Sequence, residues 1–250
     1  MKLNYMDCWN GAIAILSEHK EAILAIAGVF LFLPSVLLTQ FVGQPDVEGL
    51  TDSAAIQAAN VAFFSENWFS YVLMLVVTAI GSLSIYTLFS PSFKGTVSDA
   101  LVRSLGLLFF FIVTNLVVAI LMAVGFFLFI IPGLYLIGRL AVVPMIVADQ
   151  QQRNPVNAIK ESWKNTKNNG WAIFLFLLII LLVGMITLIV FSLVAGLIIT
   201  LVSGGEGLPL LENIVTNLIG TGFQILILAV VASLYRQLTR KDVNVSEVFS

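Results

Sequence analysis

Arg139 is the residue most able to do chemistry in this sequence, because it lies inside a long apolar run. Residues 131–149 read IPGLYLIGRLAVVPMIVAD, and Asp149 follows Arg139 by ten positions. Ten helical residues rise about 15 Å, which predicts a guanidinium near the midplane of a bilayer. An ionisable group at this depth costs at least about 2.5 kcal/mol to insert and is by default a functional-site hypothesis.

The partners expected for Arg139 are amides, since no acidic residue lies inside a predicted span: Asn115, Asn217 and Gln224. Asn213, Asn217, Gly220 and Gln224 recur at helical spacing and predict a polar stripe on the last span. Two interpretations remain open. Amides and the carbonyls freed near Pro132 or Pro144 hold Arg139 as a structural element, or Arg139 binds an anionic headgroup or solute, for which guanidinium geometry is suited.

A basic amphipathic helix follows over residues 155–168, where Asn154 and Pro155 form a typical cap and first position. Its apolar side carries Trp163, and its polar side carries three lysines: Lys160, Lys164 and Lys167. Each lysine near anionic lipid contributes about 1 kcal/mol of attraction. The alternative is that the lysines only set membrane topology. The position of Trp163 suggests anchoring at the interface.

Residues able to catalyse a reaction or hold a metal are scarce. Cys8 and His19 are the single cysteine and the single histidine, which excludes an intrachain disulfide and a Cys/His zinc site. Acidic residues gather only in residues 43–67, without a basic or nucleophilic partner. We therefore expect no enzyme activity, no cofactor and no metal.

The composition indicates a membrane protein. Of 250 residues, 59% are hydrophobic and 10% charged, with a mean hydropathy of +1.03. Soluble domains are about 45–50% apolar and about 25% charged. Apolar runs of the roughly 20 residues needed to cross a bilayer recur along the chain, and the short alternating segments of a barrel do not appear. The predicted fold is an all-α integral membrane domain over residues 1–250.

The domain is expected to contain six transmembrane helices in three hairpins, with cytoplasmic amphipathic helices. The first amphipathic helix covers residues 4–18. The predicted spans are 22–42, 68–89, 105–126, 130–148, 171–201 and 211–235. Turns or kinks are expected at Pro34, Pro132, Gly133, Pro144 and Pro155.

Two connecting segments complete this prediction. Residues 43–67 are expected to form a polar outer loop that contains acidic residues and no Lys or Arg. Residues 90–104 are expected to be a short basic segment, with Ser98 as a helix N-cap.

The distribution of basic residues predicts the orientation. Eleven of the twelve Lys and Arg residues fall on one side of the six spans, and the twelfth is Arg139. By the positive-inside rule, both termini are expected in the cytoplasm. No basic stripe with interleaved aromatic residues is present, so we expect no nucleic-acid partner.

The stretch IPGLYLIGRLAVVPMIVAD, followed by NPVNAIKESWKNTKNN, resembles the YciC-like bacterial inner-membrane proteins. It is also similar to the membrane domain fused to some glycerophosphoryl diester phosphodiesterases. The matching positions are Pro132, Gly133, Leu134, Tyr135, Arg139, Leu140, Pro144, Pro155, Ala158, Ser162, Trp163 and Lys164. The resemblance implies an inner-membrane location and a six-span architecture. It does not imply phosphodiesterase activity, because the chain has no soluble stretch long enough for that catalytic domain.

The expected function is a non-enzymatic role in contact with lipid, in envelope or membrane homeostasis. The bilayer, with its anionic lipids, is the expected partner. The alternative is a small transporter or channel for an anionic or amphiphilic solute, with Arg139 and the stripe on the last span lining its path. A water-filled cavity reaching Arg139 favours transport, and a dry, closed environment favours a structural role.

Overall fold

The computed structural model describes residues 3–204 and 207–239, and these residues form helices without any strand. The prediction of an all-α membrane fold is confirmed. Within the described ranges, six helical segments are long and apolar enough to cross a membrane: Lys20–Phe41, Ser53–Leu88, Val97–Leu128, Ile130–Gln150, Gly170–Val202 and Pro209–Thr239. Lys2, Arg240 and Lys241, which entered the count of basic residues, lie outside the described residues.

Several of these segments are divided, and two further helices lie between or before them. In chain order the elements are α1 (Tyr5–Glu18), α2 (Lys20–Ala27), η1 (Gly28–Phe32), α3 (Leu33–Phe41), α4 (Ser53–Leu88), α5 (Val97–Leu128), α6 (Ile130–Leu140), α7 (Val143–Gln150), α8 (Pro155–Asn165), α9 (Gly170–Val202) and α10 (Pro209–Thr239).

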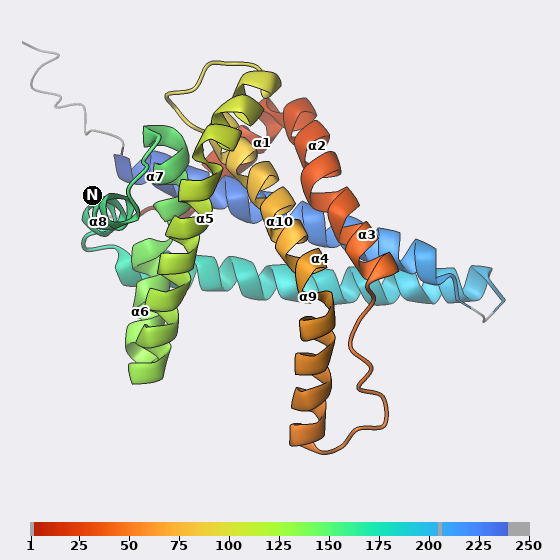
Figure 1. Ribbon diagram of the computed structural model, residues 1–250. Helices are drawn as coiled ribbons and strands as arrows, with labels where there is room; N and C mark the ends of the chain where they lie inside the picture. Colours follow the sequence, from red (N-terminus) through yellow and green to blue (C-terminus); the bar gives the residue numbers. More distant parts are fainter. Residues whose placement is uncertain (1–2, 205–206, 240–250) are drawn as a thin grey trace, which may run out of the picture.

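The hairpins meet at one end and diverge at the other (Figure 1). In Figure 1, α9 and α10 extend to the right, while α6 and the first half of α4 point downward. Buried side chains concentrate in α7, residues 81–88 and residues 228–235, and one face each of α1 and α2 packs on this core; we call these segments together the hub. The far ends are exposed, as at Phe41, Phe127 and Val202. The hub is therefore the packed core of the molecule, and the hairpin tips make few contacts.

The expected outer loop is largely helical. α4 begins at Ser53, and its N-cap Asp52 accepts a hydrogen bond from the backbone N–H of Ala55 at 3.2 Å. The prediction of a loop over 43–67 is thus wrong for residues 53–67. The alanine-rich sequence of these residues favours a helix. Because their hydropathy is low, the predicted span began about four turns after the true start of the helix.

The helix expected within the basic segment 90–104 is present; it begins at Val97 and continues without a break into the third span as α5. The N-cap is Thr96 and not Ser98. The hydroxyl of Thr96 accepts from the N–H of Asp99 at 3.3 Å, and the carboxylate of Asp99 accepts from the N–H of Thr96 at 2.8 Å. This reciprocal pair satisfies two free donors at the helix start, which a cap at Ser98 does not achieve.

The fourth span is broken after Leu140, and α7 begins at Val143 with Pro144 in its first turn. Proline lacks the N–H that a continuous helix needs and its ring clashes with the preceding turn. Arg139 therefore lies in the last turn of α6. The midplane estimate assumed an unbroken helix from Arg139 to Asp149, so the depth of Arg139 in the bilayer stays a prediction.

The other expected turns lie at helix starts or irregular turns. Pro34 follows the wider π-helical turn η1, which opens the first span just before α3. Pro132 and Gly133 lie in the first turn of α6, after the extended residue Phe129. Pro155 is the first residue of α8 and follows its N-cap Asn154.

Candidate functional site

Arg139 is buried against α8. Its Nη2 donates a hydrogen bond to the carbonyl oxygen of Trp163 at 2.5 Å. The guanidinium carbon lies 4.4 Å from the ring centroid of Trp163 and 5.8 Å from that of Tyr135. Only 3% of Arg139 is exposed. Two aromatic faces and one carbonyl thus stabilise this charge, since a cation over a ring is attracted by the ring quadrupole.

The break in the fourth span creates the second link between α6 and α8. The carbonyl oxygen of Arg139 accepts hydrogen bonds from Ser162 Oγ at 2.8 Å and Thr166 Oγ1 at 3.2 Å. A carbonyl at a helix end lacks an intrahelical partner, so these hydroxyls replace the missing N–H. Side chain and backbone of Arg139 together join α6 to α8.

α9 closes the other side of this region. A Cβ added at Gly138 would lie 1.9 Å from the carbonyl oxygen of Gly170, so the backbones of α6 and α9 are in direct contact there. Nε and Nη1 of Arg139 are buried and have no hydrogen-bond partner among the described residues. The environment of Arg139 is therefore closed and incompletely satisfied.

The amides expected around Arg139 lie elsewhere. Asn115 donates to Phe111 O of its own helix at 2.8 Å, and Gln224 lies exposed on α10. Asn217 donates to Asn213 O at 2.9 Å. The helices against which α6 mainly packs are α5, α8 and α9, so the stripe on α10 does not face Arg139.

Asn213, the first residue of the stripe on α10, instead meets α3. Asn213 Nδ2 lies 3.3 Å from Val36 O and 3.2 Å from Gln40 Oε1, and it donates to both. Gln40 lies in the last turn of α3. These contacts stabilise the first and last spans against each other near their outer ends.

A polar cluster around Asp149 was not foreseen from the sequence. Its carboxylate accepts hydrogen bonds from Ser90 Oγ, from the N–H of Ser92 at 3.3 Å and from the hydroxyl of Tyr235 at 2.6 Å. The contacts join the α4–α5 connection, α7 and α10. One signal was present in the sequence: Asp149 is the sole acidic residue between Asp99 and Glu161, and it directly follows an apolar run.

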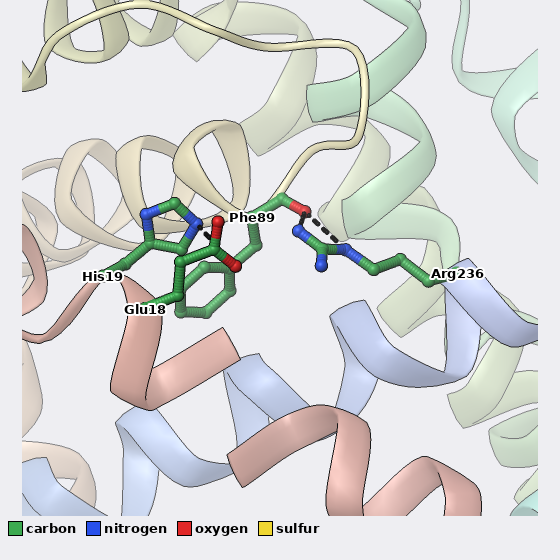
Figure 2. Close-up of polar contacts among 4 residues, drawn as sticks. All are labelled: Glu18, His19, Phe89 and Arg236. Atoms are coloured by element: carbon green, nitrogen blue, oxygen red, sulfur yellow. Dashed lines mark hydrogen bonds and ion pairs between the residues drawn. The ribbon is translucent and has the colours of Figure 1, made fainter. Parts of the chain in front are cut away.

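Arg236 makes a second polar contact in the hub. Its Nε and Nη2 donate to the carbonyl oxygen of Phe89 at 3.1 and 2.8 Å (Figure 2). Beside it, His19 Nε2 lies 3.9 Å from a carboxylate oxygen of Glu18, and the rings of His19 and Phe89 are 6.0 Å apart. Arg236 thereby caps the end of α4 with a residue from the end of α10.

These hub residues border a cavity of about 830 Å³. The charged side chains that line it are mixed in sign: Asp7, Glu18, Lys94 and Arg236. The mixture favours neither an anionic nor a cationic ligand. Within residues 3–204 and 207–239, no three His, Cys, Asp or Glu side chains come together in an arrangement that could hold a metal ion.

α8 presents its lysines to the outside. Lys160, Lys164 and Lys167 are exposed, and Lys164 Nζ lies 3.8 Å from Glu161 Oε1. Trp163 is 42% exposed while it contacts Arg139. Exposure suits both lipid contact and a topology signal, so the role of the lysines stays a prediction.

An apolar cleft of about 600 Å³ lies between α1 and the hairpin of α9 and α10. Tyr5 and Trp9 of α1 line one wall, and Phe176 of α9 stacks on Tyr5 with 5.2 Å between the ring centroids. Gly222 of α10 also lines the cleft, and a Cβ added there meets no atom within 4 Å. The sequence predicted α1 as amphipathic but gave no sign of which helices it faces.

Cys8 lies at the buried face of α1 and is not a reactive thiol. Its Sγ donates to Gln237 Oε1 at 3.0 Å. Burial, aided by the nearby charge of Asp7, raises the pKa of the Cys8 thiol to about 12. The thiol is therefore protonated at neutral pH and packs as a small apolar group.

Comparisons of the chain with protein families, with curated proteins and with solved structures found no match.

Proposed function

We propose that this chain is a non-enzymatic bacterial inner-membrane protein that contacts lipid and serves envelope or membrane homeostasis. The observation that carries the proposal is the apolar cleft between α1, α9 and α10. Its position beside two segments apolar enough to cross a membrane makes an acyl chain the chemically matched occupant. The inner-membrane location rests on the resemblance to the YciC-like proteins.

The walls of the cleft suit a lipid chain. Aromatic rings line the α1 side, and the adjoining surface of α9 exposes apolar residues such as Val183 and Ile186. An amphipathic helix with Trp and Tyr on its apolar side is typical of a segment lying at the headgroup level. A chain in the cleft would therefore run from α1 toward the bilayer core along α9.

The hub is proposed to face the cytoplasm. Described basic residues at or near it include Lys20, Lys94, Arg103, Arg153 and Arg236. Described residues of the hairpin tips at 42–52 carry no Lys or Arg. This asymmetry favours a cytoplasmic hub by the positive-inside rule.

The cleft can be filled by one substitution with a matched control. Gly222→Leu places a side chain in the cleft, whereas Gly220→Leu adds the same side chain two positions away on α10 at a glycine that does not line it. Mass spectrometry of lipids that co-purify with each variant is the measurement. We expect Gly222→Leu to lose retained lipid and Gly220→Leu to retain the amount bound by the original chain. Equal retention in all three proteins would overturn the proposal.

The transporter alternative receives less support, because Arg139 is closed and Asn213 of the stripe on α10 meets α3. Liposomes containing the chain offer a direct test. Solute flux that Arg139→Leu abolishes, while the protein remains folded, would favour transport over the lipid-contact role.

A further inference from the structure

We propose that a second cleft, between α5 and the connection from α7 to α8, binds the phosphate of a phospholipid with net negative charge. The guanidinium groups of Arg103 and Arg153 bind this phosphate. The inference rests on the proposed lipid contact, but it concerns a different site and a specific headgroup. The cleft has a volume of about 380 Å³, and Arg103, Gly106, Gln151 and Arg153 are among the residues that line it.

Arg103 is a fixed cation on the second turn of α5. Its Nη2 donates to the carbonyl oxygens of Ala148 and Asp149 at 2.7 and 2.9 Å, and its guanidinium carbon lies 5.6 Å from the ring centroid of Phe93. These contacts hold the guanidinium in one place. A fixed guanidinium loses less entropy on binding an anion than a free one does.

Arg153 turns back toward the same helix. It is exposed, and its guanidinium carbon lies 5.8 Å from the ring centroid of Phe110 on α5. Among residues 3–204 and 207–239, no carboxylate oxygen lies within 4 Å of a basic nitrogen of Arg103 or Arg153. Two guanidinium groups thus border one cleft without an ion pair, and guanidinium groups match phosphate oxygens in a bidentate geometry.

The acidic groups nearby are already engaged. Asp99 lines the cleft, but its Oδ2 accepts from both the N–H and the hydroxyl of Thr96 at 2.8 Å. The carboxylate of Asp149 accepts from Ser90, Ser92 and Tyr235. These donors occupy the carboxylate oxygens and leave both carboxylates charged. Asp149 does not line the cleft, and the residues that do line it carry two positive charges and one negative charge, which suits a ligand with a single negative charge.

The surface beside the cleft selects a lipid over a free phosphate. Gly106 leaves part of the cleft open, because a Cβ added there meets nothing within 4 Å. Val102, Leu105 and Phe109 are strongly exposed on the same helix, and α5 is apolar enough to span a membrane. A phosphate between the arginines therefore continues into an apolar surface that matches acyl chains.

Native mass spectrometry of the full chain, titrated with anionic glycerol-headgroup phospholipid, tests the site. Arg153→Gln removes one guanidinium that contacts the Phe110 ring, and Lys20→Gln removes one exposed charge from α2, outside this cleft, as the matched control. Gly106→Leu fills the cleft and keeps both arginines. We expect Arg153→Gln to weaken anionic-lipid binding about tenfold, the loss of one charge-assisted contact. Gly106→Leu should also weaken it, because the added side chain occupies the space of the phosphate. Lys20→Gln should change it less than twofold.

Titrations with two other compounds identify the ligand. Zwitterionic ethanolamine phospholipid should bind the original chain more weakly and respond little to Arg153→Gln. Inorganic phosphate at millimolar concentration should not displace the bound lipid, because it gains nothing from the apolar surface. Displacement by phosphate, equal binding of the zwitterionic lipid, or unchanged affinity in both cleft variants would each overturn the inference. Gly222→Leu provides a separate test of the proposed function. If Gly222→Leu loses retained lipid while Arg153→Gln binds anionic lipid as the original chain does, this site is overturned and the proposed function stands.

Discussion

Replacing Arg139 with leucine tests whether its guanidinium is a structural link or a ligand-binding group. The change removes the hydrogen bond to Trp163 and the stacking on two rings, which together contribute about 4 kcal/mol. It also removes two buried nitrogens that have no partner, each costing about 2 kcal/mol. The two sums offset each other, so the free energy of unfolding should change by less than about 2 kcal/mol.

The expected shifts follow from that balance. In a chain of this length, 1 kcal/mol corresponds to about 2–4 °C in Tm. Arg139→Leu should therefore shift Tm by less than about 8 °C in detergent. Arg139→Ala also leaves a cavity, which costs at least about 2 kcal/mol more and lowers Tm by about a further 6 °C. Arg139→Lys should lie below leucine as well, because an ammonium group cannot reproduce the planar stacking on Trp163.

Thermal unfolding followed by tryptophan fluorescence, with and without added anionic lipid, measures all three variants. Gly138→Ala is a positive control, since its Cβ would meet the Gly170 carbonyl and must force α6 and α9 apart. An Arg139→Leu protein less stable than Arg139→Ala would refute the reasoning. A stable Arg139→Leu protein that has lost a lipid-dependent rise in Tm would show instead that Arg139 binds the lipid.

Three further predictions concern orientation, the thiol and α8. In a Cys8→Ala background, Gln44→Cys should react with an impermeant thiol reagent added from the periplasm and Gln152→Cys should not; the reverse pattern would overturn the orientation. Because the folded pKa of Cys8 is raised to about 12, its contribution to stability is complete below the unfolded value of about 8.5 and is lost as pH rises toward 12. Thiolate absorbance of the folded protein should therefore stay flat from pH 8 to 10, and a titration near pH 9 would contradict the burial effect. Replacing Lys160, Lys164 and Lys167 together with Gln should reduce retained anionic lipid while the spans stay inserted, whereas unchanged retention would leave these lysines as topology signals.

The sequence predicted helix boundaries poorly where a boundary depends on contacts with other residues or lies in a polar part of the helix. Ser98 and Thr96 both suit an N-cap, and the reciprocal bond of Asp99 decides between them. The helical start of α4 at Ser53 was hidden because a hydropathy pattern marks the apolar part of a helix and not its polar extension. Both errors concern boundaries and leave the number of apolar segments unchanged.

Composition and pattern by themselves determined that the chain is an all-α membrane protein with six spans. In a bilayer the protein must satisfy its own backbone polar groups, which only helices and closed barrels achieve; long unbroken apolar runs without alternation favour the helix. The one-sided placement of Lys and Arg is likewise a property of the sequence, because it depends only on which loops carry charge.

Tertiary structure alone decided which groups meet. Arg139 faces Trp163 and not Asn217 because the fourth span breaks after Leu140 and α6 packs on α8. The Asp149 cluster joins residues from position 90 to position 235, and the Arg103–Arg153 cleft depends on how α5 lies against the end of α7. Such contacts are set by helix packing and by the direction of a break, which hydrophobic periodicity does not encode.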